Sequence, residues 1–292
     1  MNRGVILIGA GVGIGLLAKH LMANKDEIGK IEDYRFPSSG KIDRYWGDVK
    51  PINYTGRTVQ YQSFHMSPEA GAKRFNLRGI EFGNWMNQKD RASHFAAGME
   101  GLNDLASVLR KKPSQLGFNR KLAIAFGARG NPRTAAHYET GSWVINQTKE
   151  NGKFGSLAHE YGHFIDNIVG SRYHNSKLAY GAGNGIRATT DEDLLNSGSI
   201  LAEYEKLFDI LYWTKDGKPT SFYRQQNART HYYKLRVEVW ARTFEVYCTI
   251  RMAELGITNR YLQKAHSSAW PPKELVAKAI PHIEKIIRYA FG

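Results

Sequence analysis

The chain has 292 residues, of which 42% are hydrophobic and 12% aromatic, a composition typical of globular proteins that excludes a disordered chain. Its formal net charge of +14 favours anionic partners such as DNA, acidic lipid or acidic protein, although a solvated basic surface is an equally good explanation. The single cysteine, Cys248, excludes both an intrachain disulfide framework and a cysteine-rich metal site.

The chain begins with an uncharged, glycine-rich, apolar segment between Arg3 and Lys19. A spanning helix usually needs ~20 apolar residues, but a tilted helix whose flanking lysine reaches the interface can be shorter. A signal peptide and a buried core helix are the alternatives; no clear cleavage site follows, and glycine-rich helices form poorly in water. We expect residues 1–24 to form a single-pass membrane anchor, inserted through residues 1–22, so that the protein is membrane-associated.

The same segment contains glycines spaced almost as in a dinucleotide-binding turn. The fingerprint Gly-x-Gly-x-x-Gly requires a third glycine where this chain has Ile14 or Leu16. No regular alternation of strands and helices follows, so a Rossmann fold is not expected.

Residues 25–70 are polar and interrupted by proline and glycine, and no helical period persists in them. They are expected to form a linker with some short strands. From residue 71 to the end the apolar pattern is denser, and residues 71–292 are expected to form the folded domain.

Within this domain, one helical face is predicted from apolar side chains at helical spacing, namely Phe95, Met99, Leu102, Ala106 and Leu109. A buried strand is predicted within 121–130, and a second strand or a hairpin within 136–146. Further helices are predicted over 191–212 and 233–251, and a last helix from a proline pair to the C-terminus, with a kink at Pro281. Because helices outnumber strands, the fold class is predicted to be α+β with a small sheet.

The segment SLAHEYGHFID, residues 156–166, contains two histidines four residues apart with a glutamate beside the first. Its apolar positions predict a helix, which Gly170 is expected to end. On a helix, residues i and i+4 project from the same side, so His159 and His163 can present nitrogens to one zinc ion. Glu160 is rotated away from that axis and can act as a general base, because zinc lowers the pKa of water towards ~7. A solvated histidine face beside a core helix is the alternative.

A catalytic zinc needs a third protein ligand and one open position. The helix predicted over 233–251 leaves Glu238 and Glu245 on a face beside its apolar stripe. Glu238 is expected to be the third ligand, with Glu245 in reserve, unless Glu238 only forms an exposed i, i+4 pair with Arg242.

The residues just before that helix, His231, Tyr232 and Tyr233, are catalytic candidates, because a hydroxyl or imidazole there could stabilise an oxyanion. Packed tyrosines without a catalytic role are the more common arrangement. His137 and Glu139 could line the cleft, although a packed strand with its polar ends in water is the more common arrangement.

Six segments carry a resemblance to a known family, in this order along the chain: RGIEFGNWM (78–86), AFGARG (125–130), AHYE (136–139), VIN (144–146), SLAHEYGHFID (156–166) and EVWARTFEVY (238–247). Together they resemble the zincin-like large polyvalent protein-associated domain, type one, found in proteins of bacterial viruses and conjugative elements. The resemblance runs from about residue 75 to about residue 247. It implies a zincin fold, a zinc site at His159 and His163 with Glu160 as base, and a third ligand matching Glu238. Unlike the long multidomain chains that usually carry such domains, this chain is short and begins with a hydrophobic segment.

The sequence therefore predicts a membrane-anchored zinc metallopeptidase of a bacterial virus or mobile element, acting on a protein or peptide. The alternative is a non-catalytic virion or membrane structural protein on a zincin scaffold, which binds DNA or acidic lipid through its basic surface. Glu160 favours the enzyme, because a degenerate enzyme often loses its base first. A peptidoglycan hydrolase is a third possibility, since the fold alone does not identify the substrate.

Overall fold

The structure is a computed structural model, which describes residues 66–83, 88–128, 136–147, 155–183, 185–186, 190–262 and 267–292, with only the backbone at 88–90, 92 and 93. The predicted anchor, residues 1–24, and nearly all of the predicted linker lie outside the described residues. Among the helices in the described ranges, none combines the length and the apolar character needed to cross a membrane.

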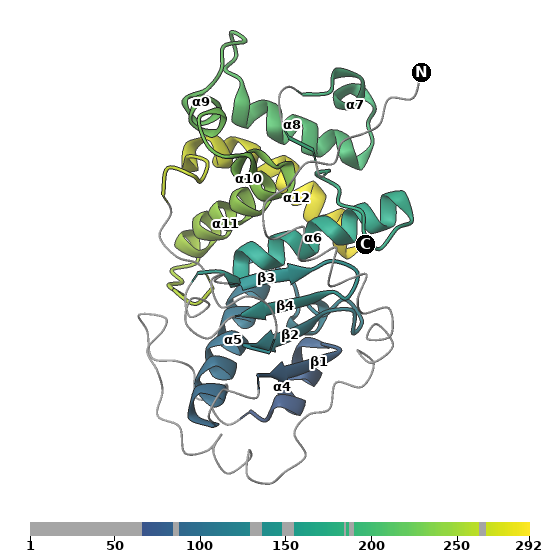
Figure 1. The fold of residues 1–292 in the computed structure, drawn as a ribbon, viewed down its shortest axis with the longest axis vertical. Helices are drawn as coiled ribbons and strands as arrows, with labels where there is room; N and C mark the ends of the chain where they lie inside the picture. The colour runs from purple at the N-terminus through teal and green to yellow at the C-terminus, as the bar shows by residue number, and fades with distance from the viewer. Residues whose placement is uncertain are drawn as a thin grey trace.

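A small mixed sheet forms one layer of the molecule (Figure 1). Its strands are β1 (Gly79–Phe82), β2 (Ala123–Phe126), β3 (Ala136–Glu139) and β4 (Val144–Gln147), in the order β1-β2-β4-β3. β1, β2 and β4 are parallel, whereas β3 runs antiparallel to β4 and lies at one end of the sheet. The strand predicted within 121–130 and the hairpin predicted within 136–146 are confirmed.

Helices cover the sheet and form most of the remaining structure: α4 (Pro68–Phe75), α5 (Gln88–Val108), the short 3-10 helix η2 (Pro113–Gln115), α6 (Leu157–His174), α7 (Glu192–Asn196), α8 (Ile200–Tyr212), α9 (Ser221–Asn227), α10 (His231–Lys234), α11 (Arg236–Glu254) and α12 (Lys273–Phe291). The predicted α+β class with a small sheet is confirmed. The five apolar residues predicted to share one helical face are all buried; four lie on α5, and Leu109 directly follows its last residue. α4 begins three residues before the expected domain start at residue 71, with the Ser67 hydroxyl accepting a hydrogen bond from the backbone of Ala70.

α6 lies between the sheet and the C-terminal helices (Figure 1). The prediction that Gly170 ends this helix is wrong, because the helix continues to His174 and Asn175 ends it in the left-handed conformation with φ 50°. Gly170 has a packing role instead. A Cβ atom at this position would lie 2.4 Å from the carbonyl carbon of Tyr180, so only glycine lets the chain return this closely past the helix.

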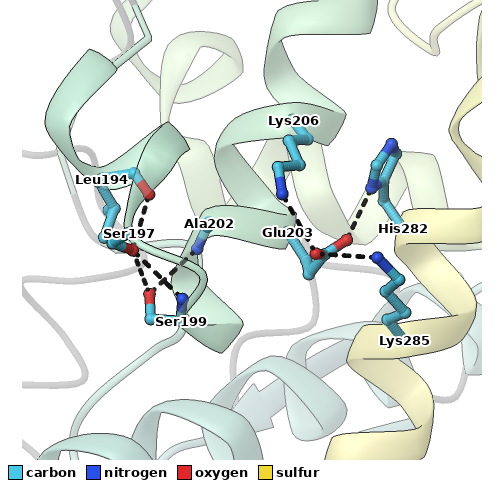
Figure 2. A network of polar contacts seen from close by, with 8 residues as sticks. All are labelled: Leu194, Ser197, Ser199, Ala202, Glu203, Lys206, His282 and Lys285. Carbon is cyan, nitrogen blue, oxygen red and sulfur yellow. Dashed lines mark hydrogen bonds and ion pairs between the residues drawn. The ribbon is translucent and has the colours of Figure 1, made fainter.

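The helix predicted over 191–212 is two helices, α7 and α8. Gly198 has φ 69°, which breaks the helix, and the Ser199 hydroxyl then accepts a hydrogen bond from the backbone of Ala202 and caps α8 (Figure 2). On the other side of α8, Glu203 contacts His282 and Lys285 of α12 at 2.7 and 3.1 Å (Figure 2). These contacts join α8 to α12, which begins directly after the proline pair as predicted and contains Pro281.

Candidate metal centre

α6 and α11 pack tightly against each other, and this contact positions the site. Gly162 on α6 lets α11 approach, since a Cβ atom there would lie 3.2 Å from the Cβ of Phe244 and 3.3 Å from the Cα of Ala241. The fully buried Trp240 donates its indole N–H to the carbonyl oxygen of Gly162 over 2.8 Å. Because Gly162 lies between the two histidines and Trp240 follows Glu238 by two residues, the packing brings the Glu238 carboxylate to the histidines.

His159, His163 and Glu238 form a group whose ligand atoms lie within 4.8 Å of one another. The Nε2 atom of His159 lies 3.5 Å from Oε2 of Glu238, and the Nε2 atom of His163 lies 3.5 Å from Oε1 of the same carboxylate. Around a tetrahedral zinc ion with bonds of about 2.1 Å, ligand atoms are about 3.4 Å apart. The imidazole–carboxylate separations therefore match those of a zinc site.

The Glu238 carboxylate has an unsatisfied atom that a metal ion would satisfy. Its Oε2 atom is buried and has no hydrogen-bond partner among the described residues. The guanidinium of Arg242 lies 3.6 Å from this oxygen, beyond hydrogen-bond distance, while it donates to the backbone carbonyl of Tyr233 over 2.6 Å. The predicted i, i+4 contact with Arg242 thus exists, but it is buried and coexists with the histidine contacts.

Glu245, the reserve ligand, lies on the other side of His159. Its Oε2 atom lies 3.4 Å from Nδ1 of His159 and accepts the indole N–H of Trp270 over 2.6 Å. Histidines that bind metals commonly donate their second ring N–H to a carboxylate, which fixes the tautomer and the ring orientation. The geometry gives Glu245 this orienting position and leaves Nε2 of His159 directed at Glu238.

The negative charge around His159 is strong. Burial alone would lower the pKa of its imidazole, but the neighbouring carboxylates of Glu238 and Glu245 outweigh burial and raise that pKa to about 10. Burial would raise the pKa of Glu238, yet the neighbouring imidazoles of His159 and His163 hold it well below its ordinary value. Surroundings that stabilise an imidazolium cation will also stabilise a divalent cation in its place.

Glu160 is buried and lies next to the group. Burial raises the pKa of its carboxyl group, while the charges of His159, His163 and His137 act in the opposite direction. His137 belongs to β3, where its Nε2 atom lies 3.2 Å from Oε1 of Glu139. The charge of a residue on the end strand thus acts on Glu160, although simple packing of this strand was the favoured expectation.

The three residues predicted before α11 have different positions. Tyr232 is 46% exposed as a whole residue, but the pKa of its phenol is raised by burial and then by the nearby charge of Glu238. The ring of Tyr233 instead packs under the guanidinium groups of Arg229 and Arg242, with ring-centre distances of 5.1 and 5.2 Å. Within the described part of the chain, His231 makes no contact with His159, His163 or Glu238. Of these three residues in the described part of the chain, Tyr232 is the one whose pKa responds to Glu238.

Trp270 is the neighbour of the site that sequence reasoning missed. It lies in the segment before α12, outside every predicted motif, and the chain must fold before its indole meets Glu245. A tryptophan just before a proline pair carries no signal for this contact.

Comparison with known families identifies the C-terminal part of the chain. Residues 224–289 match the family model of the large polyvalent protein-associated domain 1. The predicted family is therefore confirmed for this stretch. The match to the large polyvalent protein-associated domain 1 runs from α9 to α12 and shares residues 224–247 with the resemblance predicted from the sequence. It includes Glu238, Glu245 and Trp270, whereas both histidines lie outside it. No curated protein and no solved structure match the chain.

Proposed function

We propose that this protein is a zinc-dependent metallopeptidase with a zincin-like fold. The observation that carries the proposal is the group formed by His159, His163 and Glu238, with the buried Glu160 beside it. Two imidazole nitrogens and a carboxylate oxygen from two helices, with a fourth position open, are the donor set of a catalytic zinc site. An amphipathic helix with solvated histidines would not bury an unsatisfied carboxylate oxygen between the rings.

In this proposal His159, His163 and Glu238 hold the ion, and Glu245 orients His159. A zinc ion bound there would supply Lewis-acid activation of water and of a peptide carbonyl. Glu160, buried beside the two histidines, accepts the proton of the attacking water. The phenol of Tyr232 donates a hydrogen bond to the oxyanion that forms on the substrate.

The substrate in this proposal is an extended peptide segment. β3 lies at one end of the sheet, so one side of its backbone has no neighbouring strand among the described residues. Extended peptides bind to such edges by adding a strand, which holds the backbone straight. His137 on β3 lies close enough to Glu160 to lower its pKa, so a peptide along β3 would pass the candidate base.

The remaining parts of the proposal rest on the sequence. A membrane location depends on residues 1–22 and an origin in a bacterial virus or mobile element depends on the family match. Release of the full-length protein from membranes by high salt would contradict an apolar anchor, since salt screens charge attraction and leaves apolar burial intact. The non-catalytic alternative keeps the scaffold and the basic surface without turnover.

The deciding experiment compares the full-length protein with Glu160→Gln and His159→Ala. We expect about one zinc per chain in the parent and in Glu160→Gln, and little in His159→Ala. Cleavage of a denatured protein should fall by ~10²-fold or more in Glu160→Gln, because glutamine cannot accept the proton. Equal rates would show that Glu160 is not the base. Zinc binding without cleavage by the parent would favour the non-catalytic scaffold.

A further inference from the structure

A basic surface lies at the end of α6 opposite the candidate metal centre. Three segments meet there, residues 110–121, 171–178 and 288–292, and none contains an aspartate or glutamate. Their basic side chains, which we call the basic end, are Arg110, Lys111, Lys112, Arg120, Lys121, Arg172, Lys177 and Arg288. All of these residues are exposed except Lys111, which is partly buried.

Specific contacts hold the three segments together. The ammonium groups of Lys121 and Lys177 lie 5.4 and 5.3 Å from the ring centre of Trp143, so two segments share one indole. The ammonium of Lys111 lies 4.8 Å from the ring centre of Phe291, which joins the first segment to the C-terminus. Arg172 donates to the backbone carbonyl of Tyr289 over 2.6 Å, and the C-terminus lies beside the end of α6 (Figure 1). The basic end is therefore one surface assembled by the fold.

The charges of this surface are not neutralised within the described part of the chain. No ion pair between described residues includes any member of the basic end. Cations that lie within a Debye length, about 10 Å at 0.1 M salt, repel one another. A partner with closely spaced negative charges would remove this repulsion, and a nucleic-acid backbone is such a partner.

Exposed aromatic rings distinguish among polyanions. Tyr173 and Tyr289 are 44% and 36% exposed, and both are neighbours of basic-end residues in the sequence. Unpaired bases stack on such rings, whereas bases inside a duplex are not accessible to them. A lipid surface would instead require several exposed aliphatic or aromatic side chains that insert together, and Leu178 is the only exposed large aliphatic residue of the three segments.

We propose that the basic end binds single-stranded nucleic acid, with phosphates on the lysines and arginines and bases on Tyr173 and Tyr289. The site is separate from the metal group. His159 and Arg172 are thirteen residues apart on α6, about 20 Å at 1.5 Å per residue. Binding at the basic end and peptidase activity can therefore be lost independently.

The test uses the full-length protein and fluorescence anisotropy of a labelled DNA strand of about 20 nucleotides, its duplex, and phosphatidylserine vesicles in a parallel sedimentation assay. We expect the strand to bind more tightly than the duplex, with an affinity that falls steeply with salt. The triple variant Lys112→Glu, Arg120→Glu and Lys121→Glu should bind at least about tenfold more weakly. The control variant Lys215→Glu, Lys273→Glu and Lys278→Glu changes the net charge equally at exposed positions outside the basic end, and should stay within about twofold of the parent.

The rings are tested by Tyr173→Ala and Tyr289→Ala. Each should weaken strand binding about fivefold or more while leaving the salt dependence unchanged, because stacking involves no phosphate contact. Equal weakening by the two charge triples would overturn the proposal, since only net charge would then matter. Equal affinity for strand and duplex would refute the role of the rings. Because residues 1–22 are themselves expected to insert into membranes, vesicle binding by the parent is not informative, but vesicle binding that falls in the basic-end triple variant while strand binding stays unchanged would assign the surface to lipid.

Discussion

The position of Glu245 leads to the sharpest prediction for the metal centre. The carboxylate contacts His159 at 3.4 Å and Trp270 at 2.6 Å through the same oxygen, Oε2. Glu245→Gln removes the negative charge but keeps an oxygen that can accept from both partners. Glu245→Ala removes the contact entirely and leaves the imidazole free to rotate. The two variants therefore separate the effect of the charge from the effect of the hydrogen bond.

The expected losses follow from these contacts. Removing a carboxylate that orients a metal-binding histidine costs about 10–100-fold in metal affinity, or roughly 1.4–2.7 kcal/mol. Because the contact to His159 is long, Glu245→Gln should lie near the lower end, about tenfold. Glu245→Ala should approach about 100-fold, since neither charge nor acceptor remains.

Zinc affinity can be measured by competition with a chromogenic chelator at constant pH, with circular dichroism to verify folding. Glu254→Gln is the matched control, because Glu254 lies on the same helix and is exposed. Unchanged affinity in both Glu245 variants would refute the orienting role. A complete loss, equal to that of Glu238→Ala, would show that Glu245 is itself a ligand.

Three further predictions concern the site and the fold. Tyr232→Phe should lower kcat about 10²-fold with little change in KM, because it removes a donor to the oxyanion. Tyr233→Phe keeps its ring under the two arginines and should leave kcat unchanged. Equal effects of the two variants on kcat would contradict the assignment. Because the pKa of His159 is raised to about 10 without metal, zinc must displace a proton from this imidazole. The zinc affinity should therefore rise by up to about tenfold per pH unit between about pH 7 and 9. Zinc titrations at three pH values measure this dependence, and a pH-independent affinity would contradict it. Gly170→Ala should lower the free energy of unfolding by about 2 kcal/mol or more, because its Cβ atom would lie 2.4 Å from a backbone carbon of Tyr180. Gly185→Ala is the control, since no atom lies within 4 Å of its added Cβ, and it should destabilise far less in the same thermal melts.

The sequence was sufficient to predict the parts of the site that depend on local periodicity. The four-residue spacing of His159 and His163 requires only that the segment be helical, and the apolar stripe of α11 was enough to orient Glu238. The excess of predicted helices over predicted strands likewise indicated a small sheet among helices, and the run from 136 to 146 was compatible with the hairpin.

The failures have a common physical cause, which is tertiary contact. Glycine is common at helix ends, which led to the wrong prediction for Gly170. In the structure, the close approach of the chain at Tyr180 requires a glycine inside the helix. The break before α8 depends on Gly198 adopting a positive φ, which the apolar pattern on either side conceals. The meeting of Trp270 with Glu245 likewise depends on how the segment before α12 packs on α11.

The boundary of the family match divides the metal group between two stretches of chain. Glu238, Glu245 and Trp270 lie inside residues 224–289, while both histidines come from α6. A protein that inherited only the matched stretch would have the carboxylates and the indole but no imidazole to share a metal ion with them. The matched stretch is therefore smaller than the set of residues that could hold a metal ion. A family match to this stretch alone does not indicate a metal site in another protein, unless that protein also has a helix that supplies the histidines.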